Sequence, residues 1–163
     1  MTPEKDQELC SKYPLIFRNR NGDMRTTAMC WGIEVGDGWF NLIDTACRLI
    51  EGPYHSAAEH YERLKSAEGK TLFSGGAVID AAAVESARLK MQEAAAEVPV
   101  AVQVKEKFGT LRFYLNNANA QARAYVRFAE EMSACTCEQC GAPGNREGGG
   151  GWIRTRCTAC LGK

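Results

Sequence analysis

The fold of this chain is decided by residues 100–115, which have the sequence VAVQVKEKFGTLRFYL. Valine stands at positions 100, 102 and 104, and a period of two is typical of a β-strand. In the second half Leu111, Phe113 and Leu115 alternate with other residues in the same way. Gly109 lies between the two runs and favours a turn. The stretch therefore predicts a β-hairpin with apolar faces turned toward a core.

Helical patterns flank this hairpin on both sides. Apolar residues at three- and four-residue steps predict an amphipathic helix over residues 39–50, with Asp37 as its N-cap and Gly52-Pro53 as its stop. We expect further helices at residues 57–67, 77–97 and about 120–132, and a strand at residues 24–35. The predicted fold class is α+β: a hairpin or small antiparallel sheet packed by about four helices, followed by a C-terminal zinc ribbon.

The ribbon is predicted from two C-x2-C pairs, Cys137 with Cys140 and Cys157 with Cys160, which sixteen residues separate. Each pair can supply two corners of a tetrahedron, and this spacing is typical of a four-cysteine zinc site. Four protein thiolates leave no coordination position for water or substrate, so we expect the Zn²⁺ to be structural. The composition changes after Ser133, which predicts an α+β domain at 1–133 and a zinc ribbon at 134–163.

The other four cysteines are not predicted to bind the metal. Cys135 is a competing ligand two residues before Cys137, but the C-x-C spacing is less usual in such sites. Cys10, Cys30 and Cys47 are scattered along the chain, and we expect them to be small core residues.

Composition indicates a globular protein of a reducing cytoplasm. No run approaches 18 apolar residues, which excludes a transmembrane helix, and the first ten residues lack the apolar segment of a signal peptide. The net charge is zero, but residues 1–98 hold eleven Lys/Arg against fifteen Asp/Glu, whereas residues 99–163 hold nine against five. This asymmetry is too mild to identify a dedicated nucleic-acid binder.

The basic residues of the C-terminal half form a candidate binding surface. Such a surface can contact phosphates and stack a base, or it can meet an acidic protein surface. A solvated strand face is the third interpretation, and the sequence does not separate the three. The candidates are Lys105, Lys107 and Arg112 in the hairpin, and Arg146, Trp152, Arg154 and Arg156 in the ribbon.

We expect no enzymatic activity. The two histidines stand five residues apart and form no Ser-His-Asp pattern. Glu34, Asp37 and Asp44 form an acidic group near a glycine turn, where capping and solvated roles are the more common ones. The enzymatic alternative is a metal-dependent nuclease that uses Glu34, Asp37 or Glu106.

Three stretches together are similar to a group of small bacteriophage and prophage proteins with a C-terminal four-cysteine zinc ribbon. They are GDGWF with LID at 36–44, VKEKFGTLRFY at 104–114, and the cysteine-bearing tail with CGAPG at 140–144 and GWIRT at 151–155. The resemblance implies a phage origin, a host bacterial cytoplasm and no catalytic residues. It favours a non-enzymatic accessory protein that binds a host protein or complex, above all an anti-phage defence system. The alternative is a zinc-ribbon nucleic-acid-binding accessory protein.

Overall fold

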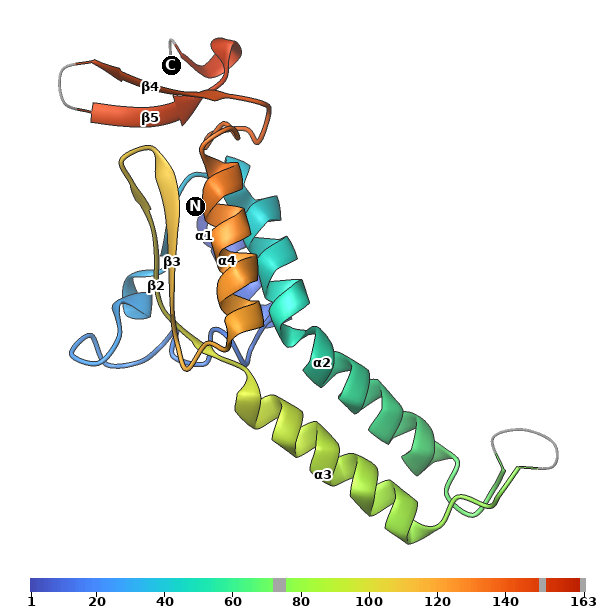
Figure 1. Ribbon diagram of the computed structural model, residues 1–163. Coiled ribbons are helices and arrows are strands. Elements are labelled where there is room, and N and C mark those ends of the chain that lie inside the picture. Colours follow the sequence, from blue (N-terminus) through green and yellow to red (C-terminus); the bar gives the residue numbers. More distant parts are fainter. Residues whose placement is uncertain (72–75, 150–151, 162–163) are drawn as a thin grey trace. The chain divides into compact units, whose positions relative to one another are not determined.

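A computed structural model of the chain describes residues 1–71, 76–149 and 152–161 (Figure 1). Two compact units can be distinguished, one formed by residues 1–50 with 99–163 and the other by residues 51–98. Within the described residues, four α-helices accompany a three-stranded mixed sheet and a separate two-stranded hairpin. The α+β prediction is therefore confirmed. No helix of the described ranges combines the length and apolar character that crossing a bilayer requires.

The helices are α1 (Pro3–Lys12), α2 (Phe40–Ser66), α3 (Ala81–Glu97) and α4 (Ala120–Ser133). The strands are β1 (Ile33–Glu34), β2 (Val100–Lys107), β3 (Thr110–Asn116), β4 (Asn145–Gly149) and β5 (Trp152–Arg156). Short 3-10 turns lie at Ala28–Trp31, Asp37–Trp39 and Thr158–Cys160.

The predicted hairpin is present as the antiparallel pair β2–β3, with Phe108 and Gly109 at positive φ in its turn. The sheet is not purely antiparallel, however, because β1 pairs with β2 in parallel, Ile33 opposite Val104. The strand expected at residues 24–35 is wrong over most of its length. Residues 28–31 instead form a 3-10 turn, capped by Thr27 Oγ1, which accepts a hydrogen bond of 3.1 Å from the amide of Met29.

The alternation of the hairpin places one face in the core of the first unit. Val104, Leu111 and Phe113 are buried, and the Phe113 ring stacks on Phe17 with centroids 6.3 Å apart. The apolar face of α4 is buried as well, including Val126.

Helix α4 also closes the free edge of β3. The amide of Leu111 donates to Ser133 Oγ over 2.8 Å, and the amide of Phe113 donates to Glu130 Oε1 over 2.9 Å. Unpaired amides at a sheet edge invite pairing with other chains, and here two side chains of α4 satisfy them. This contact holds β3 and α4 side by side.

The predicted helix stop at Gly52-Pro53 is wrong, because α2 continues through both residues to Ser66 and includes the predicted helix at 57–67. A proline inside a helix leaves the carbonyl four residues earlier without its amide donor. Pro53 and Leu49 are both exposed, so that carbonyl is on a side that water can reach.

The helix expected at residues 77–97 begins at Ala81, because Asp80 Oδ1 caps it by accepting 2.8 Å from the amide of Ala83. Residues 72–75, which precede this helix in the sequence, lie outside the described residues.

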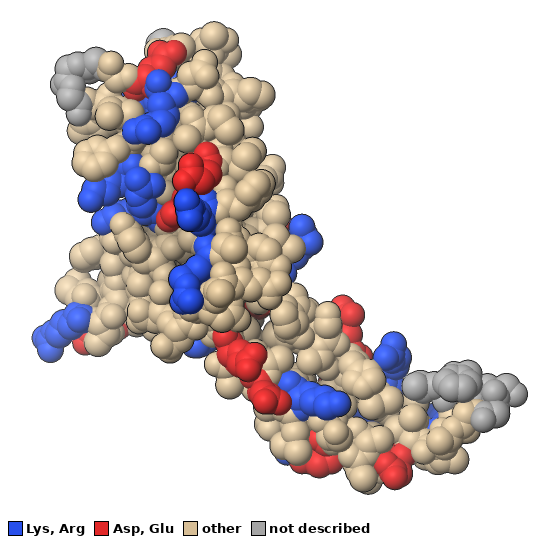
Figure 2. All heavy atoms as spheres, viewed as in Figure 1, with Lys and Arg blue, Asp and Glu red and all other residues tan. Residues whose placement is uncertain are grey.

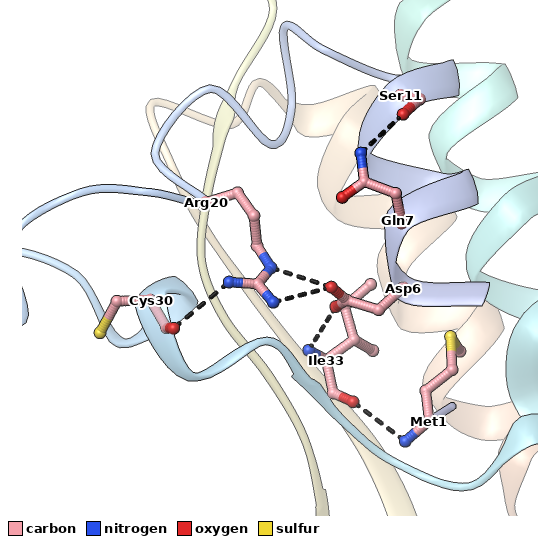
Figure 3. A network of polar contacts seen from close by, with 7 residues as sticks. All are labelled: Met1, Asp6, Gln7, Ser11, Arg20, Cys30 and Ile33. Carbon is pink, nitrogen blue, oxygen red and sulfur yellow. Dashed lines mark hydrogen bonds and ion pairs between the residues drawn. The ribbon is translucent and has the colours of Figure 1, made fainter. Parts of the chain in front are cut away.

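A buried polar network joins α1, for which the sequence predicted no element, to β1 (Figure 3). Asp6 is 8% exposed, and Arg20 Nε and Nη2 donate to its carboxylate over 3.0 and 2.8 Å. The other Asp6 oxygen accepts 2.9 Å from the Ile33 amide, while Arg20 Nη1 donates to the carbonyl of Cys30. One carboxylate thus fixes the start of β1 against α1.

Candidate metal centre and binding surface

The four predicted zinc ligands lie together. The Sγ atoms of Cys137, Cys140, Cys157 and Cys160 are all within 4.8 Å of one another, and those of Cys140 and Cys157 are 3.6 Å apart. Zinc–sulfur bonds of about 2.3 Å at tetrahedral angles place the sulfurs about 3.8 Å apart. The cluster could therefore hold one metal ion, and an all-thiolate set fits zinc.

The backbone around Cys137 favours the thiolate form of this residue. Burial acts to raise the pKa of Cys137, but amide groups of Cys157, Cys140 and Gln139 that face its sulfur lower that pKa to about 6. Sharing a proton with Cys157, and then burial, raises the pKa of Cys160 to about 12. A bound cation stabilises such clustered sulfurs as thiolates.

Each C-x2-C pair lies on a tight turn. In the first, the amide of Gly141 donates 2.8 Å to the carbonyl of Cys137, and Gly141 adopts φ 79°, which favours glycine. In the second, the amide of Cys160 donates 3.0 Å to the carbonyl of Cys157. Residues 152–156, which lead into the second turn, form β5, paired antiparallel with β4.

The glycine run between the two cysteine pairs is partly strand, because Gly148 and Gly149 belong to β4; residues 150 and 151 lie outside the described part of the chain. Cys135 stays outside the cluster, and its Sγ donates 3.2 Å to the carbonyl of Met132.

The first cysteine turn packs against residues 36–39. The amide of Gly38 donates 2.7 Å to the carbonyl of Glu138, and buried Trp39 donates from Nε1 to the carbonyl of Thr136 over 2.8 Å. A Cβ atom on Gly38 would lie 2.7 Å from the amide nitrogen of Cys140 and closer still to the carbonyl oxygen of Cys137. Only glycine allows the two backbones to approach this closely.

A second contact joins the ribbon to the β2–β3 turn, beside which the β4–β5 hairpin lies in Figure 1. Buried Thr155 donates from Oγ1 to the carbonyl of Gly109 over 2.5 Å, and Arg146 donates to the carbonyl of Phe108 over 2.8 Å. A Cβ on Gly109 would lie 3.0 Å from Ile153 Cγ2. The ribbon residues therefore belong to the compact unit of residues 1–50 and 99–163. The boundary at residue 133 stays a prediction.

The predicted binding residues differ in what their side chains contact. Lys105 and Arg112 stand opposite each other on β2 and β3. Lys107 lies 5.4 Å from the ring centre of Phe108, and Arg154 lies 5.6 Å from that of Trp152. Arg156 instead pairs with Glu138 over 3.4 Å, with 18% of its side chain exposed.

Two exposed aromatic side chains occur at this end of the unit. Trp152 is 66% exposed and Phe108 is 61% exposed. Phe108 was not among the predicted binding residues. Its position beside Gly109 in the predicted turn was the signal that could have identified it as exposed. We define the ribbon surface as Trp152 and Arg154, which lie on the face of β5 opposite that of the buried Thr155.

The acidic residues considered for catalysis are held by other partners. Asp37 Oδ1 accepts 2.7 Å from the amide of Thr2 instead of capping α2, and this contact keeps the pKa of Asp37 below its usual range. Asp44 accepts from Lys12 and Tyr13, and Glu106 accepts from the amide of Gly109. Together with exposed Glu34 they form no metal-binding group among the described residues, where only the cysteine cluster does.

No protein-family model matches the chain, and neither a curated protein nor a solved structure matches it significantly. Its function is therefore inferred from its own residues.

Proposed function

We propose that the protein is a non-enzymatic bacteriophage accessory protein that binds a host protein or complex through the ribbon surface and inhibits it. The observation that carries the proposal is Trp152, which is 66% exposed at one end of β5, while Thr155 of the same strand is buried and bonded to the β2–β3 turn. The phage origin, the host bacterial cytoplasm and a defence system as target rest on the sequence resemblance alone.

The chemistry of the ribbon surface suits a protein partner. Tryptophan and arginine are the residues most enriched among those that dominate binding energy at protein interfaces. Here the Arg154 guanidinium lies 5.6 Å from the Trp152 ring centre, so the two side chains support each other. Because the strand is fixed by metal ligands and by Gly109, little conformational entropy is lost when a partner binds.

A binding role is preferred to an enzymatic one because of the residues that would bind the metal. Four thiolates close the coordination shell of a zinc ion, and closed sites are structural. The metal then serves to hold β5 and its exposed side chains in place.

The proposal is tested by affinity purification from bacterial lysate with the zinc-loaded protein, after nuclease treatment of the lysate. We expect a stoichiometric protein partner that survives moderate salt, and its loss with Trp152→Ala. Trp31→Ala is the matched control, because Trp31 is 61% exposed but lies outside the ribbon surface. Recovery of no stoichiometric partner, or equal recovery with Trp152→Ala, contradicts the proposal.

A further inference from the structure

An open groove of about 820 Å³ lies between β3 and α4, and one residue of β4 reaches it. Four arginines line it: Arg112 from β3, Arg123 and Arg127 from α4, and Arg146 from β4. Arg123 and Arg127 are four residues apart and therefore share one face of the helix. Lys and Arg side chains gather on the face of this unit seen in Figure 2.

The positive charge of the groove is only partly balanced by acidic side chains. None of its four guanidinium groups pairs with a carboxylate of the described residues, whereas Arg20 and Arg156 each do. Glu130 and Glu131 also line the groove, but Glu130 Oε1 accepts from the amide of Phe113. Two glutamates against four arginines leave a net positive lining, which favours an anionic ligand.

Three of the arginines are held in position by the protein. Arg112 Nη1 donates to Thr110 Oγ1 and to the carbonyl of Leu111, both over 2.7 Å. Arg146 and Arg123 each donate to one backbone carbonyl, of Phe108 and Ala118. A guanidinium has five N–H donors, so each of these groups keeps donors for a ligand while its orientation is already set.

The groove also carries an aromatic side chain. Tyr114 is 43% exposed and lies two residues from Arg112, so both project from the same face of β3. Lys105 and Gln103 stand opposite them on β2. Arginines that contact phosphates beside an aromatic ring that stacks a base are the combination that binds single-stranded nucleic acid.

We propose that this groove binds single-stranded nucleic acid. A duplex is disfavoured because its grooves are read by a protruding helix or strand pair, whereas these arginines line a hollow. An acidic peptide would use the charges but has no base to stack on Tyr114. The site goes beyond the proposed protein-binding role and does not include Trp152 or Arg154.

The test is fluorescence anisotropy with labelled mixed-sequence 20-nucleotide RNA and DNA single strands at several salt concentrations. Four phosphate contacts predict a slope of log K against log salt of about −3 for the wild type. The double variant Arg123→Gln/Arg127→Gln should weaken binding at low salt at least about tenfold and reduce the slope by about 1.4. Arg25→Gln, which removes an exposed arginine outside the groove, should bind as the wild type does.

Tyr114→Ala separates stacking from charge. It should weaken binding about fivefold to a hundredfold with the salt slope unchanged. The proposal is overturned if the double variant binds as tightly as the wild type, or if a duplex or a polyglutamate peptide of the same length binds as well as the single strand. Trp152→Ala should retain nucleic-acid binding, so failure of this site and failure of the ribbon surface are told apart.

Discussion

The amide of Gly38 donates a 2.7 Å hydrogen bond to the carbonyl of Glu138, which lies inside the first cysteine pair. The same pair approaches Gly38 so closely that a side chain there would meet the backbone of Cys137 and Cys140. Trp39, the next residue, is fully buried and bonded to Thr136. The metal-binding segment is thus packed into the first unit, where it contacts residues 36–39.

Substitution of Gly38 tests this packing. Gly38→Ala should destabilise the protein by about 2–3 kcal/mol, because the added methyl group forces two backbones apart. The measurement is the free energy of unfolding from denaturant titration of the zinc-loaded protein.

Gly52→Ala is the matched control, since a Cβ at Gly52 meets nothing within 4 Å and the residue lies inside α2. This change should be neutral or stabilise the protein by about 0.5–1 kcal/mol. Equal destabilisation by the two changes would show that Gly38 has no special contact.

Metal content tests the ligand set. The protein should bind one zinc ion, and Cys140→Ser or Cys157→Ser should lower its metal content and weaken the thiolate-to-cobalt absorption of the cobalt-substituted protein. Cys135→Ser should keep both signals, because Cys135 lies outside the cluster. Loss of the metal with Cys135→Ser would place that thiol among the ligands.

Substitution of Asp6 tests whether its polar contacts hold α1 in place. Asp6→Ala should cost about 3 kcal/mol in unfolding free energy, because it leaves the half-buried Arg20 and the amide of Ile33 without their acceptor. Gln7→Ala removes only an exposed contact with Ser11 and should change stability by less than about 0.5 kcal/mol. A similarly small effect of the Asp6 and Gln7 substitutions would mean that the Asp6 carboxylate contributes little to stability.

The sequence predicted those features whose signal is local. The spacing of Cys137, Cys140, Cys157 and Cys160, and the alternation in residues 100–115, each depend on neighbours a few positions away. Helix α4 was found for the same reason, and its cap Asn119 accepts from the amide of Ala122.

Features that depend on distant residues were missed. The contact between Cys137 and Gly38 joins positions about a hundred residues apart. The GDGWF motif contributed to the resemblance, but the sequence did not show that its second glycine packs against the first cysteine pair. Helices were predicted on both sides of Pro53, but the low helix propensity of glycine and proline suggested a helix end between them. Arg123 and Arg127 were not among the predicted binding residues, since only the fold brings them beside Arg112.

Amide hydrogen exchange with and without zinc is the most direct test that the metal centre is built into the first unit. Removal of zinc should speed exchange in the ribbon and also in residues 36–40 and 107–112, while α3, in the second unit, stays as it was. Faster exchange confined to the ribbon after zinc removal would contradict this claim, because the ribbon would then be an independent appendage.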